Sequence, residues 1–293
     1  MRYHIQHQTE YQYDFDVTLS QHMLHMTPRL LAWQTTLAHQ ITISPNPSET
    51  SQRLDYFGNS RLYFSIYSPH HTLSVISEST VEVLPRVLPA SLSQSPSWEF
   101  VKEELIQHYN THIEAQAFLF SSPKAGRHHT LANYAAPSFT PGRPLLEAAL
   151  DLTQRIYQDF EFDDQATSIS TPLSDVLAGR RGVCQDFAHL MIACLRSLGL
   201  ACRYVSGYIL TTPPEGQERM IGADASHAWA SVYCPDTGWV DFDPTNNCLV
   251  QTDHITVAWG RDFSDISPMR GVVLGGGAQQ LDVSVTVTPI EQN

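Results

Sequence analysis

The sequence lacks several features that would define a whole class of protein. No run of about 18 apolar residues occurs, so we expect no helix that spans a membrane. The first residues contain no apolar segment with a small-residue cleavage site, so we expect no signal peptide. Lys and Arg total only 17 against 30 Asp and Glu, which gives a net charge of −13. Because phosphate groups repel a polyanion, we expect neither nucleic acid nor an anionic membrane as a partner.

Cysteine is also scarce, and it lacks the spacings that bind metals. The 293 residues contain five cysteines, all between positions 184 and 248. An odd number in a chain of this length is not typical of a disulfide framework, which favours a reducing, cytoplasmic location. The sequence has no C-x-x-C pair and no acidic loop of the calcium-binding type. We therefore expect no metal and no cofactor.

Residues 1–85 show the alternation of polar and apolar residues that is typical of half-buried strands. Leu62, Phe64 and Ile66 illustrate the period of two, and turn residues separate the alternating runs. Several short strands at this spacing predict an antiparallel β-sandwich as the first domain.

The rest of the chain divides into a connection and an α+β domain. Residues 86–144 are rich in Pro and Ser, and we interpret them as a connection with one helix near 97–109. From 145 to 293 the pattern predicts helices first and strands afterwards, which indicates an α+β domain. The predicted strands of this domain are 202–210, 227–234, 238–243 and 281–288.

Cys184 opens an apolar stretch that has the pattern of a buried helix. Gly182 and Val183 precede it, and Gly199 is a suitable residue to end the helix. Apolar residues lie nearly all round the predicted helix, so we expect it to be central. A thiol at a helix N-terminus can become a good nucleophile, because the helix dipole and a neighbouring imidazolium both favour the thiolate.

His227 and Asp243 lie on two predicted strands that are joined by a turn. In a hairpin centred near Pro235 these two residues lie opposite each other, and a shift of two residues still leaves them on one face. The carboxylate can then hold one imidazole nitrogen while the other faces Cys184, as a nucleophile, a base and an orienting acid require. Each of the three residues also has an ordinary structural explanation. From the residues alone, a catalytic site and a well-packed core remain open alternatives.

A second group of titratable residues offers a weaker hypothesis. Glu104, His108 and His112 recur every four residues and could in principle bind a metal. A solvated helix face is the simpler interpretation, because the sequence shows no matching set of ligands.

Four segments closely resemble the transglutaminase-like superfamily of papain-like cysteine enzymes, in its bacterial branch of cysteine proteases. They are TPLSDVL (171–177), RGVCQDFAH (181–189), GADASHAW (222–229) and GWVDFDPT (238–245). The resemblance covers about 145–250, and residues 1–85 resemble the β-rich N-terminal domain of bacterial members. It implies a papain-like, transglutaminase-like core in which the helix that begins at Cys184 packs on an antiparallel sheet.

The resemblance implies a role for each residue that matches these motifs. Cys184 matches the nucleophile, His227 the general base and acid, and Asp243 the aspartate that orients the histidine. Asp241 has the same side-chain parity as Asp243 and is a rival. Other positions of the motifs could contact substrate or support the triad, with a structural role favoured where one is evident: Asp186, His189, Asp224 and Trp229.

The implied activity is acyl transfer from a peptide or isopeptide amide through a thioester on Cys184, with a peptide or protein as substrate. Hydrolysis and transfer to an amine, as in a transglutaminase, use the same residues and stay open. A non-catalytic module that binds proteins or peptides is the third alternative, against which the intact Cys184, His227 and Asp243 speak.

Overall fold

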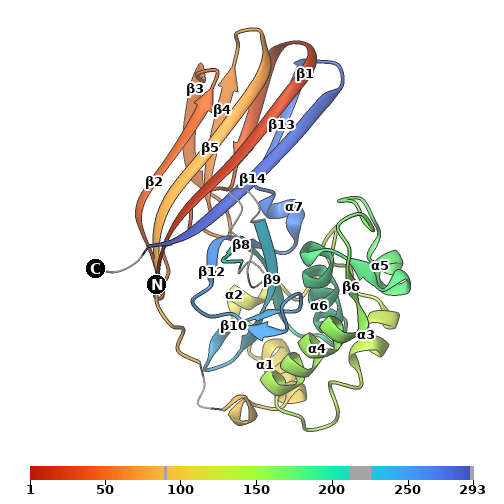
Figure 1. Ribbon diagram of the computed structural model, residues 1–293. Coiled ribbons are helices and arrows are strands. Elements are labelled where there is room, and N and C mark those ends of the chain that lie inside the picture. Colours follow the sequence, from red (N-terminus) through yellow and green to blue (C-terminus); the bar gives the residue numbers. More distant parts are fainter. Residues whose placement is uncertain (89–90, 212–225, 291–293) are drawn as a thin grey trace, which may run out of the picture.

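The computed structural model describes residues 1–88, 91–211 and 226–290. A tall, curled antiparallel sheet stands on a mixed α/β core, in which helices pack against a second antiparallel sheet (Figure 1). The start of β1 pairs with the end of β14, so both ends of the described chain lie where these two parts meet. None of the described helices is long and apolar enough to cross a membrane.

The large sheet is organised around β1 (Arg2–Leu24), which has 23 residues. The first half of β1 pairs with β5 and β14, and its second half pairs with β4 and β13. One continuous sheet therefore curls around a small apolar core, where the sequence predicted the separate sheets of a sandwich. Alternation reveals strands but not that one long strand serves both halves. The other strands are β2 (Gln34–Ser44), β3 (Glu49–Leu54), β4 (Ser60–Ile66), β5 (His70–Val83), β13 (Met269–Gly275) and β14 (Gln279–Ile290).

The last two strands of the chain also belong to the large sheet. The predicted strand 281–288 lies within β14, but it pairs with β1 and not with the strands that precede it in the sequence. Val285 and Val287 are buried there, on the side of the sheet that faces the core. The sheet thus draws on both ends of the chain, although the predicted division placed 145–293 in one domain.

The segment 86–144 is more than the connection that the sequence predicted. The helix expected near 97–109 is α1 (Trp98–Gln107), which begins where the Ser97 hydroxyl accepts a hydrogen bond from the Phe100 N–H. Three further short elements follow: a 3₁₀ turn (Leu92–Gln94), α2 (Ile113–Gln116) and α3 (His129–Ala135). The buried side chains of α1, α2 and α3 join the main hydrophobic core: Val101, Leu105, Ala115, Leu131 and Ala135.

The core is built on a five-stranded antiparallel sheet of order β11–β10–β9–β8–β12. Its strands are β8 (Cys202–Ile209), β9 (Ser226–Cys234), β10 (Gly238–Asp243), β11 (Cys248–Leu249) and β12 (His254–Gly260). The helices around it are α4 (Leu145–Asp159), α5 (Leu173–Gly179), α6 (Cys184–Leu198) and α7 (Phe263–Ile266). A short parallel pair, β6 (Glu161–Phe162) and β7 (Arg181–Gly182), leads into α6.

Helix α6 is the central element of the core and packs on β8 and β9 (Figure 1). It begins at Cys184, as predicted, and Gly199 ends it with a left-handed φ of 88°. Side chains are buried nearly all round the helix. Arg196, near its C-terminus, is fully buried and donates hydrogen bonds to the carbonyls of Phe118, Cys202 and Arg261.

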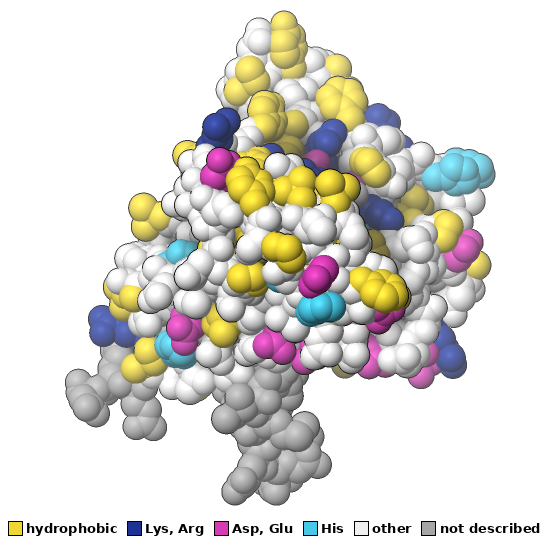
Figure 2. All heavy atoms as spheres, turned by 90° about the horizontal axis from the view of Figure 1, so that it is seen from above, with side chains coloured by type: hydrophobic (Ala, Val, Ile, Leu, Met, Phe, Trp, Pro, Cys, Tyr) yellow, Lys and Arg dark blue, Asp and Glu magenta, His cyan; other side chains and the backbone are white. Residues whose placement is uncertain are grey.

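Seen from the end of the large sheet, the surface carries hydrophobic side chains at many separate places, with charged side chains scattered among them (Figure 2). Phe15, Leu54 and Leu274 are among the exposed hydrophobic residues of this sheet. The residues of the predicted site belong instead to the core below it.

Candidate active site

Cys184 occupies the first turn of α6, and its thiol is partly exposed. The two residues before it hold the helix start in place. Val183 donates its N–H to the Asp186 carboxylate at 3.0 Å, and the same oxygen accepts a hydrogen bond from the Thr167 hydroxyl at 2.6 Å. Asp186 therefore caps the helix and fixes the backbone next to the thiol.

Gly182 is required by this cap. A Cβ at this position would lie 2.8 Å from Asp186 Oδ2 and 3.0 Å from Asp186 Cβ, which is closer than such atoms approach. The segment Gly182–Asp186 of the matched motif thus has a structural explanation. Gly182 leaves room for the Asp186 carboxylate, and Asp186 caps the helix that begins at Cys184. Asp186 is a supporting residue by this geometry.

His227 and Asp243 come from neighbouring strands, β9 and β10. Phe242 pairs with Ala230, which shifts the register by two residues from the predicted one and makes His227 and Asp243 diagonal neighbours on the same face. The hairpin is centred on Asp236, which takes a left-handed φ of 66°. The imidazole Nε2 donates to Asp243 Oδ2 at 2.7 Å.

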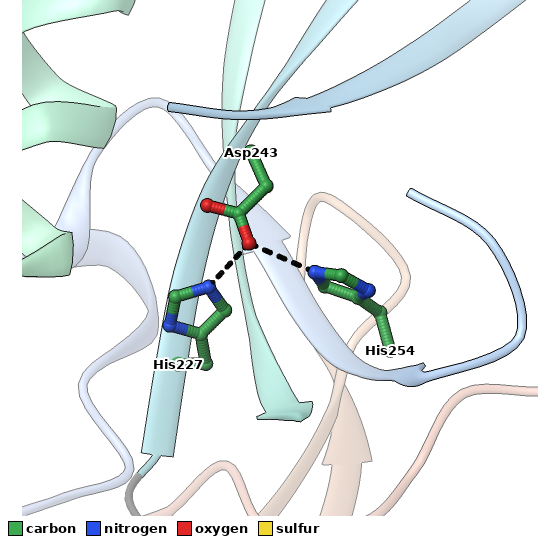
Figure 3. A group of neighbouring side chains, drawn as sticks. All are labelled: His227, Asp243 and His254. Carbon is green, nitrogen blue, oxygen red and sulfur yellow. Dashed lines mark hydrogen bonds and ion pairs between the residues drawn. The ribbon is translucent and has the colours of Figure 1, made fainter. Parts of the chain in front are cut away.

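Asp243 is fully buried, and its two carboxylate oxygens accept five hydrogen bonds. Its Oδ1 accepts the N–H groups of Thr245 and Asn246 at 2.9 and 3.2 Å, in the turn that Asp-Pro-Thr begins. Its Oδ2 accepts from His227, from the Asn246 amide at 2.7 Å and from His254 Nε2 at 2.9 Å (Figure 3). The carboxylate is thereby held in one orientation.

His254 and Asn246 are the members of this site that the sequence analysis missed. His254 comes from β12, which reaches the site because Gly207 on β8 lets it approach closely. A Cβ at Gly207 would lie 2.0 Å from the Ile255 carbonyl oxygen. Asn246 follows Asp-Pro-Thr directly, so its backbone bond to Asp243 could have been expected from the turn. Nothing in the sequence around His254 indicates its position.

The electrostatics favour an ion pair between His227 and Asp243. Burial alone would lower the pKa of His227, but hydrogen bonds to Asp243 and Cys184, together with their charges, raise it to about 10. Burial would raise the pKa of Asp243, yet the hydrogen bonds from His227 and His254 hold it well below its usual range. Because Nε2 of His227 is engaged by Asp243, Nδ1 is the ring nitrogen left for Cys184. The structure therefore places Cys184 and Asp243 beside the same imidazole.

Asp241, the rival of Asp243, lies in different surroundings. It accepts a hydrogen bond from Trp229 Nε1 at 2.9 Å and pairs with Arg86 Nη1 at 2.5 Å. Burial opposes its ionisation, but Arg86 and Arg203 lower its pKa. Trp229 is completely buried, in agreement with the structural role that we favoured for it. Asp241 thus faces a different part of the core and has no contact with His227.

Two predicted positions remain, His189 and Asp224. His189 packs and forms a hydrogen bond within the core. His189 stacks on Tyr204 with ring centroids 4.8 Å apart, and its Nε2 accepts the Phe263 N–H at 3.2 Å. Burial lowers the pKa of His189 to about 3, which keeps the ring neutral. Asp224 lies outside the described residues.

One group of described residues has donor atoms close enough for a metal ion to be considered. The ligand atoms of His227, Asp243 and His254 lie within 4.8 Å of one another. Hydrogen bonds account for this closeness, since both Nε2 atoms carry the protons donated to Asp243 and so offer an ion no lone pair. Glu104 accepts hydrogen bonds from both His108 and His112, at 2.9 and 3.3 Å.

Comparisons with known proteins agree with these observations. A family model described as the bacterial transglutaminase-like N-terminal region matches residues 3–82, and one described as the transglutaminase-like superfamily matches 108–244. An uncharacterized protein of Mycobacterium tuberculosis is 43% identical over 298 residues, covering 99% of this chain and 93% of its own. One of Mycobacterium leprae is 30% identical over 290 residues, covering 98% of each chain.

A solved structure shows the same fold. It is described as a candidate cysteine protease from Cytophaga hutchinsonii, and it superposes with a TM-score of 0.79 at 21% identity, covering 100% of this chain and 92% of that one. The chain therefore belongs to the transglutaminase-like superfamily, with the bacterial type of N-terminal region.

Proposed function

We propose that the protein is a thiol-dependent acyl-transfer enzyme, which cleaves peptide or isopeptide amide bonds through a thioester on Cys184. The observation that carries the proposal is that Cys184 and Asp243 both act on the His227 imidazole, which Asp243 holds through a hydrogen bond of 2.7 Å. These three residues come from three elements, α6, β9 and β10. Hydrogen bonds within the protein hold the start of α6 and the carboxylate of Asp243 in place. Membership of the transglutaminase-like superfamily supports a cysteine-dependent enzyme.

The first step of the proposed reaction is attack by Cys184. The helix N-terminus and the protonated His227 both stabilise a thiolate. Its sulfur forms a bond to the amide carbonyl carbon, and negative charge develops on the carbonyl oxygen. The N–H groups in the first turn of a helix have no acceptor within the helix, so that of Cys184 can donate to this oxygen.

His227 then moves the proton that each half of the reaction needs. Its Nδ1–H protonates the amine as the carbon–nitrogen bond breaks, which leaves a thioester on Cys184 and a neutral imidazole. In the second half the imidazole takes a proton from water, the oxygen bonds to the acyl carbon, and the carbon–sulfur bond breaks. The products are a carboxylic acid and the restored thiolate–imidazolium pair.

Transfer of the acyl group to an amine is the second candidate, and the family description favours it. An amine in place of water would use the same residues and form a new amide. The proposal includes a peptide or protein as substrate and a cytoplasmic location, both of which are sequence-based predictions.

The test is selective labelling of Cys184 by a peptide that carries a thiol-reactive electrophile. Among the five cysteines only Cys184 and Cys248 are not buried, so Cys248→Ala is the matched control for Cys184→Ala. Burial and the nearby Asp243 and Asp253 raise the pKa of Cys248 to about 12, so that thiol should stay unreactive near neutral pH. We expect rapid modification at Cys184 alone, unchanged in Cys248→Ala and lost in Cys184→Ala.

The companion variant is His227→Ala, which removes the base but leaves the thiol in place. Slow labelling of several cysteines that is unchanged in His227→Ala would rule out the enzyme. If Cys184 labels selectively, a primary amine added to a turnover assay distinguishes the two acceptors. A new amide product indicates transfer, and release of acid alone indicates hydrolysis.

A further inference from the structure

A cavity of about 590 Å³ lies where the chain leaves the large sheet and passes the edge of the core. Its rim comes from Ala32 and from residues 84–88, which follow β5. Its walls include Trp33, Trp239 and Trp259. None of Cys184, His227 and Asp243 lines it, so the cavity is separate from the candidate active site.

One of the two arginines in this cavity has no hydrogen-bond acceptor among the described residues. Arg203 is only 5% exposed, and its guanidinium lies between two indole rings, 4.2 Å from the centroid of Trp239 and 3.8 Å from that of Trp259. Stacking covers the faces of the guanidinium and leaves its N–H edges unpaired; Nε is buried without a partner. A buried cation in this state has the capacity to bind an anion.

Arg86, the second arginine, is only partly paired. Its side chain is 6% exposed, and Nη1 donates to Asp241. Its Nε and Nη2 are buried without a hydrogen-bond partner among the described residues, and its guanidinium carbon lies 4.8 Å from the Trp33 ring centroid. Trp33 Nε1 is a further unpaired donor among the residues of the cavity. The buried polar groups of this cavity that lack a hydrogen-bond partner among the described residues are therefore all N–H donors, so a ligand that accepts hydrogen bonds would pair with them.

Charges of both signs surround Arg203. Asp241 and Glu114 attract its guanidinium, and Arg29 and Arg86 repel it. Burial, with Arg29 and Arg86 acting in the same direction, lowers the pKa of Arg203 to about 9, although Asp241 opposes this. A bound anion would relieve the repulsion among the arginines.

We propose that this cavity binds a carboxylate carried on an apolar or aromatic body. The free N–H edges of Arg86 and Arg203 match the oxygens of a carboxylate, which guanidinium groups bind with two parallel hydrogen bonds. The three indoles and the rim of Leu84, Pro85 and Val87 suit an apolar group. The proposal does not depend on the catalytic function.

A purely structural stack of arginines and indoles is the competing explanation. Such a stack would explain the faces of the guanidinium groups but not the unpaired donors at their edges. Strand β10 connects this separate cavity to the site, because Asp241, which lines the cavity, lies two residues before Asp243. At about 3.3 Å per residue, Trp239 lies roughly 13 Å along the strand from Asp243.

Calorimetric titration of the full-length Cys184→Ala protein, which cannot turn a substrate over, tests the proposal. The probes are N-acetyl-phenylalanine, its amide and 3-phenylpropionate. We expect saturable binding of the acids and none of the amide, since the amide lacks the charge that the arginines recognise. Equal binding of both acids indicates a small free acid as the ligand, and a preference for N-acetyl-phenylalanine indicates the carboxyl end of a peptide. Either result supports the proposal.

Three variants locate the binding. Arg86→Gln and Arg203→Gln should each weaken it by about tenfold or more, as expected for loss of a charged hydrogen bond. Ala32→Phe narrows the mouth of the cavity without removing an ion pair, so it tests the site even where an arginine variant fails to fold. Arg143→Gln, in a surface pair with Asp151, is the control and should bind as the parent does. The proposal is overturned if no acid binds, if the amide binds as well as the acid, or if Ala32→Phe binds like the parent.

Discussion

His227 and His254 donate to the same oxygen of Asp243, with Nε2–Oδ2 distances of 2.7 and 2.9 Å (Figure 3). The second imidazole comes from β12, at the opposite edge of the sheet from β10 and β11, and it binds the same oxygen as the Asn246 amide. A carboxylate with this many donors stays ionised and cannot rotate freely. The consequence falls on His227, whose other nitrogen is thereby kept towards Cys184.

Asp243→Asn should abolish selective labelling of Cys184. The amide NH₂ would replace one carboxylate oxygen, and donors already face both oxygens, so one N–H group is left against another. His227 would lose its negative partner and favour the wrong tautomer. We expect the rate of Cys184 modification by the peptide electrophile to fall by about a hundredfold or more.

Asp241→Asn is the matched comparison for that variant, because it makes the same change two residues earlier. Arg86 would remain buried without its counter-charge, which should lower the free energy of unfolding by about 3 kcal/mol. The labelling rate of the folded protein should stay close to that of the wild type. A greater loss of labelling in Asp241→Asn than in Asp243→Asn would transfer the orienting role to Asp241.

The stability of the protein should depend on pH through His227. Because folding raises the pKa of His227 from 6.5 to about 10, the stabilisation is complete below pH 6.5 and is lost as the pH rises through 10. Between neutral pH and about pH 9.5 we expect urea denaturation to show a loss on the order of 2–3 kcal/mol. In Asp243→Asn this decline should be much smaller. An equal slope in both proteins would contradict the ion pair.

The same pair predicts the opposite behaviour in acid. The pKa of Asp243 lies below its ordinary value of 3.8, so its contribution is present above that pH and is lost as the pH falls below it. The wild type should therefore unfold in acid more steeply than Asp243→Asn. Circular dichroism during an acid titration measures the difference.

His254 should support the site without taking part in the chemistry. In His254→Phe, Asp243 Oδ2 loses a buried donor while a ring of similar shape remains, so we expect the free energy of unfolding to fall by about 1–2 kcal/mol. The rate of Cys184 labelling should fall by about tenfold, because the carboxylate is held less firmly and His227 with it. His108→Ala removes an exposed imidazole elsewhere and should change neither quantity. Full labelling activity in a folded His254→Phe would show that Asn246 and the turn suffice.

The local sequence pattern was enough to predict the helix that carries Cys184 and the strands that carry His227 and Asp243. The helix begins at Cys184 and ends at Gly199 because apolar periodicity and a left-handed glycine are properties of the segment itself. The shared face of His227 and Asp243 follows from the period of two along a strand. The register was shifted by two, because Pro235 takes the first place in the turn and leaves the left-handed position to Asp236.

Contacts between distant segments were out of reach of that reasoning. The alternation in β14 predicts a strand, but its partner β1 lies at the other end of the chain. His254 is found only when the order of β8, β9 and β12 is known. The short helices between 86 and 144 bury one side each, and the prolines between them conceal that pattern.

Gly182→Ala tests whether the cap of α6 positions the thiol. The added methyl group would overlap Asp186, whose carboxylate would then move away from the Val183 N–H and the Thr167 hydroxyl. Loss of this cap should lower the free energy of unfolding by about 1–2 kcal/mol. Because Cys184 is the first residue of the helix, its labelling rate should fall more than the lower stability alone explains.

Gly179→Ala is the control for that variant, since it adds the same methyl group three residues earlier. No atom lies within 4 Å of the new position, and Gly179 is helical, so alanine should leave stability unchanged or raise it slightly. Thermal unfolding and the labelling rate are measured for both variants under the same conditions. If Gly182→Ala labels as fast as Gly179→Ala, the cap stabilises the helix without positioning the thiol. If only Gly182→Ala is slowed, the glycine of the matched motif serves the reaction through Asp186.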